Sequence, residues 1–137
     1  MSDEILGFIG LGNMGQPMAR NIREKGHEMI VHDIAGTAER TPQGAEVAGS
    51  NRDIAQRAGI IALSLPTVEV NRQVVNEIAE TGRAGSVVVD TCTIGAQAAA
   101  GNARILEAAG IDYLDSPVSG LKFRAEEGTL ASMTAGA

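Results

Sequence analysis

Short apolar runs alternate along the chain with segments of helical periodicity. The apolar runs are bounded by turn residues, which is typical of buried strands. They predict strands at residues 5–9, 29–32, 60–65, 86–89 and 111–114, a last strand near 130–134 and a short edge strand at 45–48. The periodic segments predict helices over residues 13–25, 52–58, 67–80 and 96–109. Residues 34–44 and 115–129 are predicted to be loops, the first with at most a short helix.

The strict alternation of strands and helices indicates an α/β fold. Such a pattern is typical of a doubly wound, mostly parallel sheet with right-handed crossovers, the Rossmann-type architecture. At 137 residues the chain is long enough to bury a core, and it contains neither a linker nor an internal repeat. We therefore expect one domain over residues 1–137.

Three glycines end the first predicted strand and open the first helix. Gly10, Gly12 and Gly15 form a G-x-G-x-x-G pattern between an apolar strand and a helix for which Asn13 is the predicted N-cap. We expect Gly10 to allow a sharp turn, Gly12 to let a pyrophosphate approach the backbone, and Gly15 to let the helix lie close to the strand. The positive end of that helix would then face the phosphate. The alternative is a glycine-rich turn that binds nothing, or a different phosphate ligand.

An acidic residue ends the second predicted strand. Asp33 stands where a carboxylate would meet the adenosine ribose, accepting hydrogen bonds from its hydroxyls and repelling a 2′-phosphate. This favours NAD over NADP, although Arg40 could partly restore NADP binding. The alternative is that Asp33 is a solvated turn residue.

Further candidates lie at the ends of later strands. The segment Leu65–Pro66 is expected where the strand order reverses, and ligands of open α/β sheets bind at such points. Thr93 offers a hydroxyl to the cofactor or substrate, or else caps the helix at 96–109. Cys92 is interpreted as a small strand-end residue and not as a nucleophile. In the loop after the sixth strand, Ser119 and Gly120 can present a hydroxyl and backbone N–H groups to a substrate carboxylate, although by composition alone this segment would be only a turn.

Composition narrows the possible partners. The formal net charge of −6 argues against nucleic acid and against an anionic membrane surface. No apolar run is long enough for a membrane span, and the N-terminus lacks the features of a signal peptide, so a cytoplasmic location is expected. A single cysteine cannot form an intrachain disulfide. His27 and His32 have no partners at ligand spacing, so no metal site is predicted.

Four segments of this sequence together resemble a known family, the β-hydroxyacid dehydrogenases. They are GFIGLGNMGQPMARNI at 7–22, LSLP at 63–66, DTCT at 90–93, and LDSPVSG at 114–120 followed by GTL at 128–130. The family includes 3-hydroxyisobutyrate dehydrogenase and tartronate semialdehyde reductase and is related to 6-phosphogluconate dehydrogenase. The resemblance covers essentially the whole chain.

The resemblance implies NAD(P)-dependent oxidation of a short 3-hydroxy acid, or reduction of its semialdehyde. By this likeness the cofactor would be cradled by Gly10, Leu11, Gly12, Asn13, Met14 and Gly15, with Leu65, Pro66 and Thr93 along its nicotinamide half. Ser119 and Gly120 would hold the carboxylate of the hydroxy-acid substrate.

Departures from the family pattern qualify this expectation. Leu121 stands where the family has a second glycine after Ser-Gly, and Cys92 where it has serine. The family's catalytic lysine lies in an all-helical second domain, beyond Ala137, and neither Lys25 nor Lys122 matches its position. We therefore expect a truncated first domain that binds NAD without turning over substrate alone, with any homo-oligomer formed through the absent domain. The rival hypotheses are a non-catalytic dinucleotide-binding module and a reductase of another substrate class, such as imines.

Overall fold

The computed structural model describes residues 4–136, so the two ends of the domain predicted over 1–137 lie outside the described residues. The first half of the chain contains β1 (Leu6–Ile9), α1 (Gly15–Glu24), β2 (Met29–His32), the 3₁₀ turn η1 (Ala38–Arg40), β3 (Glu46–Val47), α2 (Asn51–Arg57), β4 (Ile60–Leu63) and α3 (Val68–Thr81). The second half contains β5 (Val87–Asp90), α4 (Ala96–Glu107), β6 (Asp112–Asp115), β7 (Val118–Ser119), α5 (Lys122–Glu127), β8 (Ala131–Ser132) and β9 (Ala135–Gly136).

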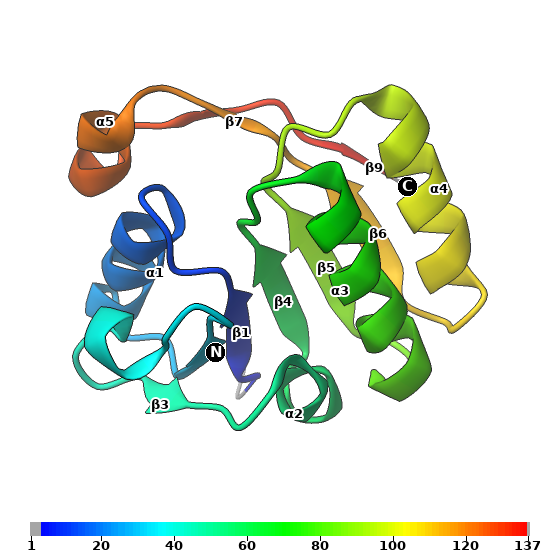
Figure 1. Cartoon of the computed structure of the whole chain (residues 1–137), viewed down its shortest axis with the longest axis horizontal. Coiled ribbons are helices and arrows are strands. Elements are labelled where there is room, and N and C mark those ends of the chain that lie inside the picture. Colours follow the sequence, from blue (N-terminus) through cyan, green and yellow to red (C-terminus); the bar gives the residue numbers. More distant parts are fainter. Residues whose placement is uncertain (1–3, 137) are drawn as a thin grey trace.

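The main sheet has seven strands in the order β3-β2-β1-β4-β5-β6-β9 (Figure 1). Its pairs are parallel except for the last, in which β9 runs antiparallel to β6. The chain leaves β1 toward β2 on one side and later returns to place β4 on the other side of β1. This is the predicted doubly wound α/β fold, and its strand order reverses between β1 and β4.

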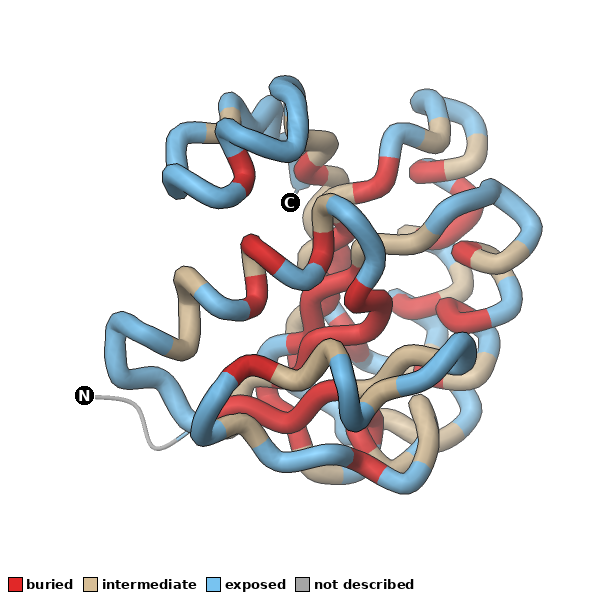
Figure 2. Tube along the Cα trace, turned by 60° about the vertical axis from the view of Figure 1, so that its left-hand side comes forward, coloured by how far each residue is buried: buried red, intermediate tan, exposed pale blue. Residues whose placement is uncertain are grey.

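Helices cover both faces of the sheet because neighbouring strand residues point to opposite sides. One core cluster joins Ile9 and Ile61 to residues of α2, α3 and α4. The other joins Phe8 and Ala62 to Ala19 of α1. Figure 2 shows the buried residues gathered along the strands in the centre of the molecule. The core is almost wholly aliphatic, as the scarcity of aromatic residues requires.

The predicted strands in the first three quarters of the chain, including the short edge strand β3, are confirmed to within a few residues. The N-cap prediction for Asn13 is wrong: the cap position is Met14, and α1 begins at Gly15. Gly15 packs closely against the carbonyl of Gly10, so the start of this helix coincides with the tight packing of the turn and not with a side-chain cap. Helices α2 and α3 are capped by Ser50 and Thr67, whose hydroxyls accept from the backbone N–H groups of Asp53 and Val70.

The predicted loop over 115–129 is wrong, because it contains β7 and α5. The predicted last strand is instead two short strands, of which β8 pairs with β7 and β9 joins the main sheet. Helix α5 is held in place by a residue of another helix. The Asn21 side chain on α1 donates to the carbonyl oxygens of Ala125 (2.7 Å) and Glu126 (3.3 Å). Only Ala125 of this helix is buried, so it carries no apolar periodicity that could have predicted it.

Candidate functional site

The glycine turn between β1 and α1 is tightly packed at two of its glycines and open to a ligand at the third. Gly10 has φ +99°, and a Cβ there would overlap the carbonyl oxygen of Ser64. A Cβ on Gly15 would likewise overlap the carbonyl oxygen of Gly10. A Cβ on Gly12 would meet nothing within 4 Å among the described residues. Gly10 and Gly15 are thus required by packing, as predicted, whereas the fold itself does not require a glycine at position 12.

Helix α1 presents its N-terminal end beside this open position. The Met14 side chain at its cap position makes no capping hydrogen bond within the described part of the chain, and the first turn has no acidic residue. The first N–H groups of a helix have no intrahelical partners, and the helix dipole places partial positive charge there. This end of α1 is therefore suited to a phosphate or another anion.

Asp33 follows β2 and is tied directly to the glycine turn. Its carboxylate accepts hydrogen bonds from the backbone N–H groups of Leu11 (2.7 Å) and Ala35 (2.8 Å). Arg40 Nη1 lies 3.5 Å from the same carboxylate. The Asp33 side chain is only 11% exposed, so its interpretation as a solvated turn residue is wrong. A carboxylate has about four acceptor positions, so the two N–H groups leave about two of them for further donors.

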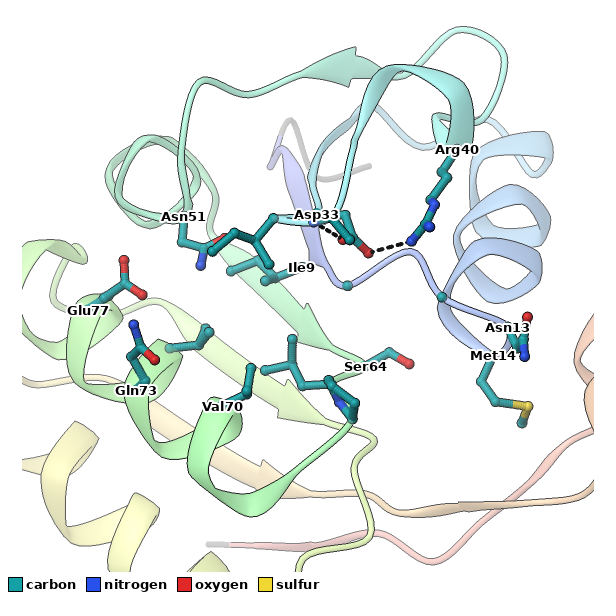
Figure 3. A pocket seen from close by; sticks show the side chains of 17 residues that line it. Ile9, Asn13, Met14, Asp33, Arg40, Asn51, Ser64, Val70, Gln73 and Glu77 are labelled. Carbon is teal, nitrogen blue, oxygen red and sulfur yellow. Dashed lines mark hydrogen bonds and ion pairs between the residues drawn. The ribbon is translucent and has the colours of Figure 1, made fainter.

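A cavity of about 460 Å³ lies at the carboxyl ends of β1, β2 and β4, where the strand order reverses (Figure 3). The structure brings many of the predicted cofactor residues together on its lining: Gly10, Gly12, Asn13, Met14, Asp33, Leu65 and Pro66. Leu11 and Gly15 are buried under the turn. The volume is in the range of ligand pockets.

Thr93 lies outside this cavity. It is exposed, between β5 and α4, and its alternative role as a helix cap is wrong because Gly95 occupies the cap position of α4 without a side-chain capping bond. Its neighbour Cys92 is buried and its sulfur accepts from the N–H of Leu65 at 3.1 Å. Burial, with the nearby Asp90 carboxylate, raises the pKa of the Cys92 thiol to about 12. The thiolate is disfavoured, as expected of a residue that is not a nucleophile.

Ser119 and Gly120 also lie apart from the cavity, at the end of β7 and just after it. Both are exposed, and the Leu121 side chain beside them is 69% exposed. Their segment is anchored by the buried Ser116, whose hydroxyl hydrogen-bonds those of Ser132 (2.6 Å) and Thr134 (2.7 Å). The loop after β6 is therefore held at its base and accessible at its tip.

A buried polar network, not predicted from the sequence, lies beneath these strand ends. Asp90 is fully buried and its carboxylate accepts from the Asn71 amide, the Tyr113 hydroxyl (both 2.8 Å) and the Cys92 N–H (3.0 Å). Asn102 in turn donates to the Asn71 side chain at 2.7 Å. Desolvation, together with the Asp90 charge, raises the pKa of Tyr113. The sequence pattern that could have predicted this network is the presence of Asn71 and Asn102 within the otherwise apolar faces of α3 and α4.

Three polar residues at the far end of the cavity were also missed: Asn51, Gln73 and Glu77. The last two follow Val70 on α3 at intervals of three and four residues. Residues at such intervals share one helix face, so the spacing could have identified a face of α3 turned toward the predicted site.

Neither a metal site nor a membrane-spanning element emerges from the described residues. Between residues 4 and 136, no three His, Cys, Asp or Glu side chains are grouped so that they could hold a metal ion. Over the same range, no helix is both long and apolar enough to cross a membrane.

Comparison with known proteins connects this geometry to a family. The family model for the NAD binding domain of 6-phosphogluconate dehydrogenase matches residues 5–137. Eubacterium barkeri 2-(hydroxymethyl)glutarate dehydrogenase is 37% identical over 93% of this chain and 44% of its own length. Human mitochondrial 3-hydroxyisobutyrate dehydrogenase is 36% identical over 96% of this chain and 40% of its own length. The chain thus spans less than half the length of these curated relatives.

Solved structures of related enzymes have the same fold as this chain. Mycobacterium tuberculosis 3-hydroxyisobutyrate dehydrogenase with L-serine superposes with a TM-score of 0.89 at 32% identity, over 98% of this chain and 47% of that one. Psf3 in complex with NADP+ and 2-OPP gives 0.85 at 26% identity, over 96% of this chain and 49% of that one. An imine reductase from Myxococcus stipitatus gives 0.79 at 23% identity, over 90% and 43%, which shows a shared fold alone.

Proposed function

This chain belongs to the β-hydroxyacid dehydrogenase family, and from that premise we propose that it is the NAD-binding domain of an oxidoreductase. The substrate class that we propose is a short 3-hydroxy acid or its semialdehyde, as the resemblance implies. The observation that carries the proposal is the open approach to Gly12 beside the uncapped N-terminus of α1. The domain boundaries that we propose, 1–137, are those expected from the sequence.

The residues lining the cavity fit a dinucleotide. The glycine turn and α1 would hold the pyrophosphate, because backbone N–H groups and the helix dipole favour an anion there. Asp33 would accept from the ribose hydroxyls, because its carboxylate is already fixed in place by the N–H of Leu11. Leu65, Pro66 and Thr93 are proposed to follow the nicotinamide half. The bound nicotinamide ring would supply hydride transfer.

We propose NAD rather than NADP as the cofactor. A 2′-phosphate placed at Asp33 would meet a fixed and largely buried carboxylate, which repels it. Arg40 offsets part of that repulsion, but its guanidinium is 3.5 Å from Asp33 and already paired with it.

Ser119 and Gly120 are proposed to hold the substrate carboxylate. Their exposure leaves the serine hydroxyl available to an anion. We propose that the proton of the substrate hydroxyl passes to a lysine outside these 137 residues, because by the family resemblance neither Lys25 nor Lys122 stands at the catalytic position. Lys122 is exposed and lies 3.9 Å from Glu126. We therefore propose that the 137 residues bind cofactor and orient reactants without completing the reaction.

The first test is a fluorescence titration of the chain with NADH and with NADPH. We expect NADH to bind more tightly, and Asp33→Asn to narrow the NADH/NADPH affinity ratio by about fivefold because it removes the repelling charge. Asp112→Asn, which removes an exposed charge on β6, is the matched control and should leave the ratio unchanged.

Two results would contradict the proposal. An absence of saturable binding to either nucleotide would remove the cofactor assignment. Steady oxidation of 3-hydroxyisobutyrate or glycerate by the 137-residue chain with NAD would refute the claim that the chain alone lacks turnover.

A further inference from the structure

The far end of the cavity, away from the glycine turn, carries a separate group of polar side chains. Asn51 begins α2, and Gln73 and Glu77 lie on α3 beyond Val70. Figure 3 shows the amide of Asn51 and the carboxylate of Glu77 directed toward one another across this end of the cavity. Val70 and Val74 supply an apolar wall next to them. An apolar wall ending in polar groups suits a flat heteroaromatic ring with polar edges.

Asn51 is held so that it offers a donor. Its side-chain oxygen lies 2.8 Å from Nδ1 of His32. An amide oxygen can only accept, so His32 donates in this contact. The amide nitrogen of Asn51 is thereby left for the cavity.

Glu77 offers an acceptor. Its side chain is 24% exposed, and its ion pair with Arg52 is long, with 4.0 Å between Arg52 Nε and one carboxylate oxygen. Arg52 instead donates its short hydrogen bond, 2.8 Å, to Glu80. The weak contact leaves most of the acceptor capacity of the Glu77 carboxylate for a ligand.

We propose that Glu77, with Asn51 beside it, recognises the 6-amino group of the adenine ring and excludes 6-oxopurines. This inference rests on the proposed cofactor function. Adenine carries a 6-amino donor flanked by ring-nitrogen acceptors, so it complements a carboxylate acceptor beside an amide donor. A 6-oxopurine places an oxygen where the amino group was, and that oxygen would face the carboxylate. Glu77 is then a specificity-determining residue of the dinucleotide site.

The test is a calorimetric comparison of NAD with nicotinamide hypoxanthine dinucleotide, which differs from it in the purine. We expect the unmodified chain to bind NAD at least about tenfold more tightly, the scale of one hydrogen bond to a charged group. Glu77→Gln should reduce the preference to about threefold or less, because an amide can rotate to donate to the 6-oxo group. Glu69→Gln, an exposed change on the same helix outside the cavity, should leave the preference for NAD unchanged. Circular dichroism of each variant verifies folding.

The outcomes separate the two claims. If the unmodified chain binds neither dinucleotide, the proposed function fails and this inference fails with it. If it binds both equally well, or if Glu77→Gln leaves the preference intact, the inference alone is overturned and cofactor binding stands.

Discussion

At the scale of single residues, the site depends on side chains that hydrogen bonds from neighbouring residues hold in place. Asp33 could be predicted from its place after the second strand, because the position of a strand end is visible in the hydrophobic pattern. Its hydrogen bond from the N–H of Leu11 could not, since that contact joins residues 22 positions apart. Asp90 shows the same limit: its partners Asn71 and Tyr113 come from α3 and β6, and no local pattern brings them together.

Cys92 gives a prediction at this scale. Because burial raises the pKa of its thiol to about 12, the folded chain holds this proton more tightly than the unfolded chain, whose cysteine has a pKa of about 8.5. The resulting stabilisation is fully present below that lower value and is lost as the pH rises toward 12. At pH 9, iodoacetamide should modify Cys92 more than about fiftyfold more slowly in the folded chain than in urea. Comparable rates in both states would show an accessible thiolate.

At the scale of elements, sequence patterns succeeded where an element buries its own apolar residues. Strands β1, β4 and β5 are continuous apolar runs and were predicted for that reason. Helix α5 buries only Ala125 and depends on hydrogen bonds from Asn21, about a hundred residues earlier in the chain. Such a helix forms because of the residue it docks against, and hydrophobic periodicity in its own sequence cannot predict it.

Removal of that docking contact should loosen α5 alone. Asn21→Ala deletes both hydrogen bonds from this side chain to the end of the helix. Amide hydrogen exchange over residues 122–128 should therefore accelerate by at least about fivefold, the effect of losing one ordinary hydrogen bond. Arg20→Ala, on the exposed side of α1, is the control and should leave that exchange unchanged. Equal exchange in the Asn21 variant would show that other contacts hold α5.

At the scale of the whole molecule, the doubly wound topology brings the parts of the site to one edge. The carboxyl ends of β1, β2 and β4 meet there, and with them the glycine turn, Asp33 and Leu65 (Figure 1). Because this convergence follows from strand order, recognition of the α/β alternation was enough to predict most of the cavity. Thr93, Ser119 and Gly120 lie outside it, so a shared role in one reaction requires a ligand that extends beyond the cavity.

The central claim, that the glycine turn holds a pyrophosphate, is tested most directly by the NADH affinity of a Gly12→Ala variant. The new methyl group meets nothing within 4 Å in the described structure, so the free energy of unfolding should stay the same. The methyl group would nevertheless obstruct a phosphate approaching the backbone. Gly49→Ala, equally open and outside the cavity, is the matched control. We predict NADH affinity at least about tenfold weaker for Gly12→Ala only; unchanged affinity would contradict the account.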